Sequence, residues 1–278
     1  MIMKKLFLLF LLVCSISKTF GQTGLEYFPS DLNIQPFAAN MLEPKLGFLF
    51  QFDKNELRLD IGSSMDLIHY KPCEDQLFSL GADLFTYTLL RGETDFHFPV
   101  DAVDYLFGLN FGYKQQFEKY EIGARLRISH ISAHFVDGHY NGTENEWRDG
   151  RFPRVYSREF LELMPYINYE NIRFYIGYTY LYHVDPLYIG KNNLQAGFDY
   201  YAKDMICKYI SPFAGYDIKL VKIGEYTANN SLHIGVKFGN AEGRGLSISY
   251  QFYSGKSIHG EYFDYQKKYS SIGLNLDL

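Results

Sequence analysis

The end of the chain shows a strict two-residue period, and this period constrains the fold more than any other feature of the sequence. Over the last seven residues, small or polar side chains alternate with the apolar residues Ile272, Leu274, Leu276 and Leu278. Successive side chains of a β-strand point to opposite faces, so the alternation predicts a strand with one apolar face. The pattern recurs in about ten segments long enough to cross a bilayer, which is typical of a closed, antiparallel, all-β transmembrane barrel.

The N-terminus has the features of a secretory signal peptide over residues 1–21. Two lysines precede an apolar run from Leu6 to Val13, and a small-residue cleavage site ends at Gly21. This run is too short to cross a bilayer as a helix, which needs about 20 apolar residues. An exported chain with the alternation described above is expected in the outer membrane of a Gram-negative bacterium.

Residues 22–45 show no alternation and contain three prolines. We therefore expect a periplasmic N-terminal extension over 22–45, followed by the outer-membrane barrel over 46–278. The sequence leaves open whether this extension plugs the barrel.

Twelve segments carry the strand pattern, and their connections alternate between short and long. The long connections, 91–101, 136–157 and 257–267, all fall on one side, as expected for the external loops of such a barrel. The first segment is slightly shorter than the roughly 9–11 residues of a spanning strand, so a ten-stranded barrel is the fallback. The expected strands are 46–53, 55–69, 76–90, 102–117, 119–135, 158–170, 172–184, 191–202, 210–221, 229–239, 244–256 and 268–278.

The composition agrees with a membrane barrel and argues against one class of partner. Aromatic residues make up 18% of the chain, which suits aromatic girdles at the two membrane interfaces. The formal net charge is only -5, whereas proteins that bind nucleic acid neutralise phosphates with basic residues. We expect membrane lipids, and not nucleic acid, as partners.

Charged side chains on the inward faces of two neighbouring strands predict a narrow, filled lumen. The inward positions of 119–135 and 158–170 hold Glu121, Arg125, Arg127, Arg158 and Glu162. Opposite charges on adjacent strands are expected to pair across the lumen, so a wide open pore is not expected.

One constellation has the residue types for acyl-transfer chemistry. On strand 119–135 the outward apolar row continues into His130, Ser132 and His134, and the next strand places Glu159 at a similar level. A serine, a histidine and a carboxylate can act as nucleophile, base and orienting group. Ser132 would attack an acyl ester, His130 would take its proton, and Glu159 would fix the imidazole tautomer.

A second interpretation of the same residues needs no chemistry. His130, Ser132 and His134 would then lie above the membrane boundary, where polar side chains are cheap and the loop begins. His130 and His134 are four residues apart on a strand, or about 13 Å, which is too far to share one metal ion.

The pair His130-Ile131-Ser132, with Glu159 from the next strand, resembles the outer-membrane phospholipase A and lipid A 3-O-deacylase families. Both carry a His-x-Ser pair on an outward barrel face. The resemblance implies acyl-ester hydrolysis of phospholipid or lipid A and makes a homodimer a candidate assembly. The sequence departs from these families at Ala133, where they have asparagine, so the oxyanion donors are unassigned. Calcium dependence is open, and nothing singles out Asp137 or Asp149 as a ligand.

A broader resemblance runs from about Tyr27 to Tyr201. The chain resembles a bacterial envelope family catalogued as domain of unknown function twelve-oh-seven, which is grouped with outer-membrane barrels and has no established activity. The segments that carry this resemblance are Pro36 to Asn40, Glu43 to Lys45, His130 to His134 with Asp137, Ser157 to Glu159, and Leu194 to Gly197 with Tyr200.

Two classes of function follow from these observations. In the first, the chain is an outer-membrane barrel that would hydrolyse acyl esters of phospholipid or lipid A through Ser132, His130 and Glu159. Alternatively, it is a non-catalytic barrel, either a narrow channel or an envelope interaction protein, whose working surface is the lumen or the external loops.

Overall fold

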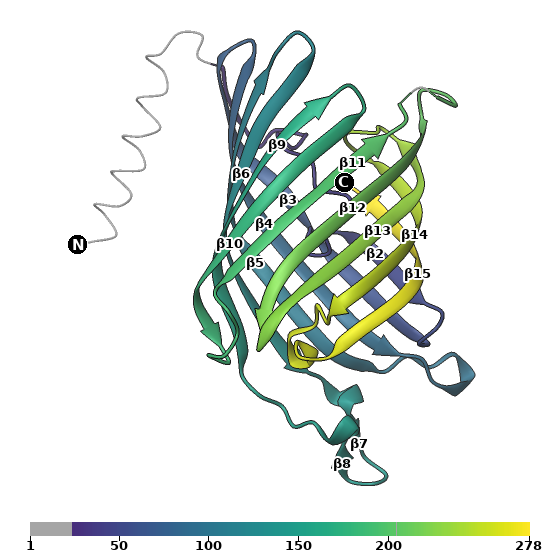
Figure 1. Cartoon of the computed structure of the whole chain (residues 1–278). Coiled ribbons are helices and arrows are strands. Elements are labelled where there is room, and N and C mark those ends of the chain that lie inside the picture. The colour runs from purple at the N-terminus through teal and green to yellow at the C-terminus, as the bar shows by residue number, and fades with distance from the viewer. Residues whose placement is uncertain (1–23, 204) are drawn as a thin grey trace, which may run out of the picture.

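Twelve antiparallel strands close into a ring in the computed structural model, which describes residues 24–203 and 205–278 (Figure 1). The ring closes where the last strand, β15, pairs with β2, and β2 pairs with β3. The predicted barrel and its twelve strands are confirmed, and the ten-stranded fallback is wrong. The strands of the ring are β2 (Leu46–Gln51), β3 (Glu56–Cys73), β4 (Gln76–Arg91), β5 (Val100–Gln116), β6 (Tyr120–Phe135), β9 (Tyr156–Tyr169), β10 (Ile172–Asp185), β11 (Asn192–Tyr201), β12 (Ile210–Ile223), β13 (Glu225–Gly239), β14 (Gly245–Lys256) and β15 (Gln266–Asp277).

Several short elements lie outside the ring and were not predicted. Strand β1 (Gly24–Tyr27) pairs with the far end of β3. The others lie in the connections after β4, β6 and β14. They are η1 (Thr94–Phe96), η2 (Asp137–His139), β7 (Tyr140–Asn141), β8 (Glu146–Trp147), η3 (Arg148–Gly150) and η4 (Gly260–Tyr262).

No helix in the described part of the chain is long and apolar enough to cross a membrane.

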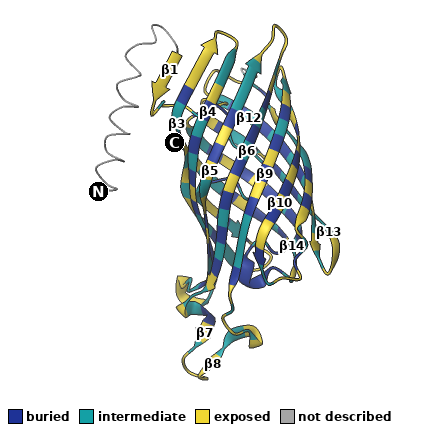
Figure 2. Cartoon of the chain, turned by 90° about the vertical axis from the view of Figure 1, so that its left-hand side faces the viewer, coloured by how far each residue is buried: buried dark blue, intermediate teal, exposed yellow. Residues whose placement is uncertain are grey.

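The wall of the barrel is apolar outside and polar inside. Figure 2 shows exposed and buried positions alternating along β5, β6 and β9. On β5 the outward residues Tyr105, Phe107 and Leu109 are exposed, whereas Arg125 and Arg127 on β6 are buried in the lumen. Exposed apolar rows of this extent need lipid to cover them, so the alternation that builds the strands also places the barrel in a membrane.

The three connections predicted to be long, which follow β4, β6 and β14, all lie at one end of the barrel, as expected. The strands are joined by short turns at 117–119 and 170–171, and by long loops at 136–155 and 257–265. The 257–265 loop folds back over the external mouth, and its residues Glu261, Tyr262 and Phe263 are buried. The predicted signal peptide, residues 1–21, lies outside the described residues.

The segment that precedes the first ring strand lies inside the lumen. Phe37, Asn40 and Glu43 are at most 2% exposed. Arg173 on β10 donates hydrogen bonds to the backbone oxygens of Gln35 and Pro36. We call residues 32–45 the lumenal segment. The sequence left open whether the N-terminal extension plugs the barrel, and in the structure this part of it lies inside the lumen.

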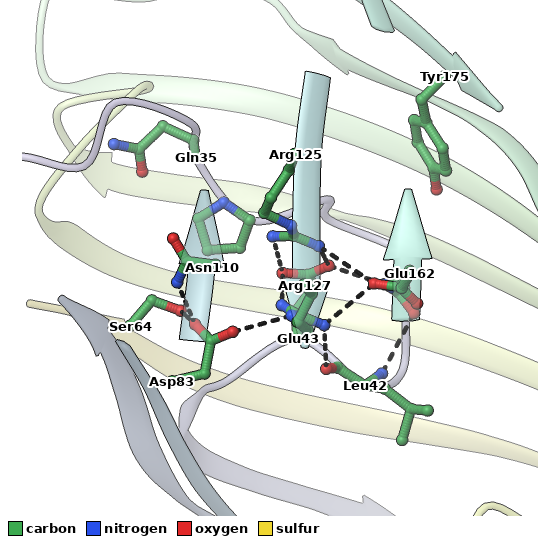
Figure 3. Close-up of polar contacts among 12 residues, drawn as sticks. Gln35, Leu42, Glu43, Ser64, Asp83, Asn110, Arg125, Arg127, Glu162 and Tyr175 are labelled. Atoms are coloured by element: carbon green, nitrogen blue, oxygen red, sulfur yellow. Dashed lines mark hydrogen bonds and ion pairs between the residues drawn. The ribbon is translucent and has the colours of Figure 1, made fainter. Parts of the chain in front are cut away.

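Glu43 is the ionic centre of the lumen (Figure 3). Its carboxylate accepts hydrogen bonds from Arg125 at 2.5 and 2.8 Å and from Arg127 at 3.3 Å. Arg127 also lies 2.8 Å from Asp83 and 3.3 Å from Glu162. Burial alone would raise the pKa of Glu43, but the two guanidinium groups lower it to about 2.

The lumenal segment separates two cavities. One, of about 230 Å³, lies towards the end with short turns and is lined by Lys203 and Glu242. The other, of about 70 Å³, lies beneath the 257–265 loop and is lined by Met41 and Phe263. A solute that crosses the barrel would have to displace the lumenal segment.

Replacing Glu43→Gln is expected to lower the free energy of unfolding by about 3 kcal/mol, because two buried guanidinium groups lose their shared anion. The check is urea unfolding in detergent micelles, followed by circular dichroism. Glu118→Gln, at an exposed turn position, is the matched control and should leave the unfolding midpoint unchanged.

The same carboxylate predicts a pH dependence with a definite sign. The folded pKa of about 2 lies below the ordinary value of 4.5, so the unfolded chain binds the proton more tightly. The stabilisation from Glu43 is complete above pH 4.5 and is lost as the pH falls towards 2. Stability measured across this window should fall more steeply in the wild type than in Glu43→Gln; parallel curves would contradict this role.

Candidate functional site

The β6–β9 pairing brings the sequence-predicted residues together on the outer wall. In the register of this pair, His130 lies opposite Glu159, and Ser132 lies opposite Ser157. All four are on the outward face of the wall, close to the external ends of their strands. Although the connecting loop between β6 and β9 is long, the two strands remain neighbours, so the length of this loop does not separate the site.

His130 and Glu159 form a direct hydrogen bond. The imidazole Nδ1 donates to Glu159 Oε1 at 2.6 Å, and the Ser157 hydroxyl donates to the same oxygen at 3.3 Å. The side chains of His130 and Glu159 are 28% and 24% exposed, so the pair is partly shielded from its surroundings. With Nδ1 protonated, the Nε2 of His130 has a free lone pair.

Ser132 follows His130 by two residues on the same face of β6. It is partly exposed, and no hydrogen bond joins its hydroxyl to another residue in the described ranges. The third polar residue of the row, His134, is exposed, and its ring lies 6.1 Å from that of Tyr105. His134 therefore does not join the His130–Glu159 pair.

An additional residue, His183, contacts the site although simple alternation does not place it there. Along β10 the outward row ends in Tyr180 and Tyr182, which would turn His183 towards the lumen. The pairing of β10 with β9 instead shifts between Leu181 and His183, and His183 comes to lie opposite Glu159. Its Nδ1 then donates to Glu159 Oε2. The bulge that re-aims His183 leaves no signal in the residue pattern.

The surroundings of this cluster match a membrane boundary. The ring of Phe107 lies 4.9 Å from the His130 ring. Ile128 and Leu161, next along the same faces, are exposed and apolar. The polar cluster thus lies at the edge of the apolar belt.

One group of ligand-type side chains lies in the external loops. Candidate ligand atoms of Asp101, His139 and Asp149 all lie within 4.8 Å of one another. Arg91 lies 3.1 Å from Asp101 and 3.3 Å from Asp149, so its guanidinium already supplies a cation to both carboxylates. Calcium prefers about six to eight oxygen ligands. A set that contains an imidazole and is neutralised by Arg91 does not fit calcium.

The same group links the external ends of β4 and β5 to two loops. The Tyr262 hydroxyl, from the 257–265 loop, donates to Asp101 at 2.8 Å and lies 3.4 Å from an oxygen of Asp149. Arg91, at the end of β4, contacts the same two carboxylates. Burial raises the pKa of Tyr262, and the neighbouring Asp101 raises it further. These contacts tie the external loops together over the mouth.

A closed barrel with an apolar belt, a filled polar lumen and long loops at one end is an outer-membrane β-barrel protein. The family model of proteins of unknown function, DUF1207, matches residues 109–278. The chain belongs to this family. The match begins later than the resemblance seen in the sequence and extends through the last strands. No curated protein matches the sequence.

Solved barrels share the fold at low sequence identity. Outer membrane phospholipase A from Escherichia coli is 13% identical, with a TM-score of 0.52 over 84% of this chain and 91% of that chain. The outer membrane phospholipase of Salmonella typhi, solved as a dimer with bound calcium, is 14% identical, with a TM-score of 0.52 over 88% and 94%. The CymD monoaromatic hydrocarbon channel is 10% identical, with a TM-score of 0.41 over 80% and 72%. The likenesses to the two phospholipases show that this chain shares their fold.

Replacing Arg91→Gln should loosen the external loops, because Asp101 and Asp149 lose the cation between them. Limited proteolysis of the 136–155 loop, followed by mass spectrometry, should proceed about fivefold faster, as expected for a loss of roughly 1 kcal/mol. Lys54→Gln, in the exposed β2–β3 turn, is the control. Equal cleavage rates in both variants would contradict the link between the loops.

Proposed function

We propose that this outer-membrane barrel is a serine acyl-ester hydrolase that acts on phospholipid or lipid A at the outer leaflet. The single observation that carries the proposal is the His130–Glu159 hydrogen bond of 2.6 Å, two residues from Ser132 on one outward face. It is the arrangement in which a carboxylate orients a base beside a nucleophile.

The proposed roles follow from the donor and acceptor atoms. Ser132 Oγ attacks the ester carbonyl carbon while its proton passes to Nε2 of His130. Glu159 keeps the Nδ1 proton in place and stabilises the imidazolium that forms. His130 then returns the proton to the leaving alcohol, and an acyl group stays on Ser132. Water, activated by the same imidazole, releases the fatty acid and restores the serine.

The position of the cluster supports a lipid substrate over a soluble one. Phe107, Ile128 and Leu161 surround it with apolar side chains. An acyl chain lying in the outer leaflet would contact these residues while its ester group reaches the polar rim. Membrane lipids are accordingly the proposed partners.

The proposal includes a homodimer as the candidate assembly. The outer wall is convex at the cluster, so a second copy would supply the opposite side of a substrate cleft. The Salmonella typhi relative in fold is a dimer. Cross-linking of the purified protein, with and without calcium, tests this part separately from the chemistry.

The alternative function, a narrow channel, is favoured by the polar lumen. Lys114, Arg173 and Lys237 line the larger cavity, together with Glu121 and Asp199. The lumenal segment lies across this path, so conduction would require its displacement.

Ser132→Ala should abolish acyl release while the protein still folds, because the hydroxyl faces outward and makes no hydrogen bond within the described ranges. Purified, refolded protein is assayed on phospholipid and lipid A, with and without calcium. The matched control is Ser63→Ala, which removes an exposed serine on β3. Hydrolysis at the wild-type rate by Ser132→Ala would refute the proposal.

If the channel function holds instead, single-channel currents should appear in planar bilayers. Arg125→Gln should then change the ion selectivity, because it removes a positive charge from the lumen. The absence of any conductance from correctly folded wild-type protein would count against the channel.

A further inference from the structure

We infer that His183 is a positioning residue that fixes the Glu159 carboxylate and, through it, the tautomer of His130. The inference rests on the proposed function for its effect on rate, but its structural content stands on the hydrogen bonds alone. Neither the family match nor the fold likeness assigns a role to this residue.

Glu159 has two carboxylate oxygens, and each has its own donors. His130 and Ser157 donate to Oε1, whereas His183 donates to Oε2. A carboxylate held at one oxygen only can still swing about the torsions of its side chain and carry that oxygen away from its donor. The donor on Oε2 removes this freedom and keeps Oε1 directed at His130.

The backbone is shaped to make this contact. The register between β10 and β9 shifts between Leu181 and His183, and a bulge of this kind re-aims a side chain and is common beside active sites. Tyr182 and His183 are consequently both exposed. An unbulged β10 would direct His183 to the lumen, away from Glu159.

A histidine can lie at the external rim without a carboxylate partner. His134 lies on the outward face of β6, beyond Ser132, and contacts the ring of Tyr105. It makes no hydrogen bond with Glu159. His134 is therefore a matched control for His183: both are exposed imidazoles at the external rim.

The consequence for His130 is a single tautomer. With Glu159 fixed, the proton stays on Nδ1, and Nε2 keeps a lone pair that can accept a proton. If Glu159 swings away from His130, the Nδ1 proton loses its acceptor, and the other neutral tautomer becomes populated. That tautomer cannot accept a proton at Nε2, so it is inactive as a base for Ser132.

The structural test is nitrogen NMR of histidine-labelled, refolded protein at a pH where the imidazoles are neutral. His130 should appear as one Nδ1-protonated tautomer in the wild type and as a mixture in His183→Ala. His183→Asn keeps an N–H near the Nδ1 position and should restore the single tautomer. His134→Ala should leave it unchanged. A single unchanged tautomer in His183→Ala would overturn the inference, whether or not the protein hydrolyses lipid.

The kinetic test separates positioning from substrate binding. In His183→Ala, kcat should fall about tenfold, which corresponds to about 1.4 kcal/mol, while KM stays within about twofold of the wild-type value. His183→Asn should recover most of the rate. A rise in KM with kcat unchanged would place His183 in lipid binding and overturn the positioning role.

The two failures are distinguishable. If wild-type protein releases no fatty acid from either lipid, the proposed hydrolase fails, and the NMR result alone decides the role of His183. If the wild type is active and His183→Ala retains full kcat and one tautomer, the hydrolase stands and the inference about His183 fails.

Discussion

Every backbone polar group that crosses a membrane must find its hydrogen-bond partner within the protein, and this requirement governs the whole structure. Strands meet it only when the sheet closes on itself, which β2 achieves by pairing with both β15 and β3. Closure then assigns each side chain to lipid or to the lumen, since successive residues alternate between the two faces. The apolar belt, the ionic lumen and the polar rim all follow from that assignment.

The buried charges in the lumen and the polar residues at the external rim have different arrangements. In the lumen, Arg125 and Arg127 converge on one buried carboxylate from the lumenal segment, so the charges neutralise one another and hold the segment in place. At the rim, the carboxylate of Glu159 instead accepts hydrogen bonds from two imidazoles. The first arrangement suits a fixed structure, whereas the second suits acid–base chemistry.

The sequence predicted the parts of the structure that obey the two-residue period. The twelve ring strands, the outward row of β5 and the pairing of His130 with Glu159 across β6 and β9 all follow from alternation and neighbouring strands. The role of Glu43 does not, because it lies 82 residues from Arg125 in a segment without regular structure. His183 was missed for a related reason: a bulge reverses its face, and one inserted residue changes no hydrophobic pattern.

The way in which the lumenal segment is attached decides how it could leave the barrel. On one side the segment follows β1, which pairs with β3 beside the turn to β4, and on the other it leads into β2, which begins opposite the last residues of β15. Both ends of the segment therefore lie at the end of the barrel with the short turns. Withdrawal through that mouth would break the ion pairs that Glu43 makes with Arg125 and Arg127, but it would leave every strand pair of the ring intact. The lumenal segment is thus held by its side chains and not by the closed wall around it.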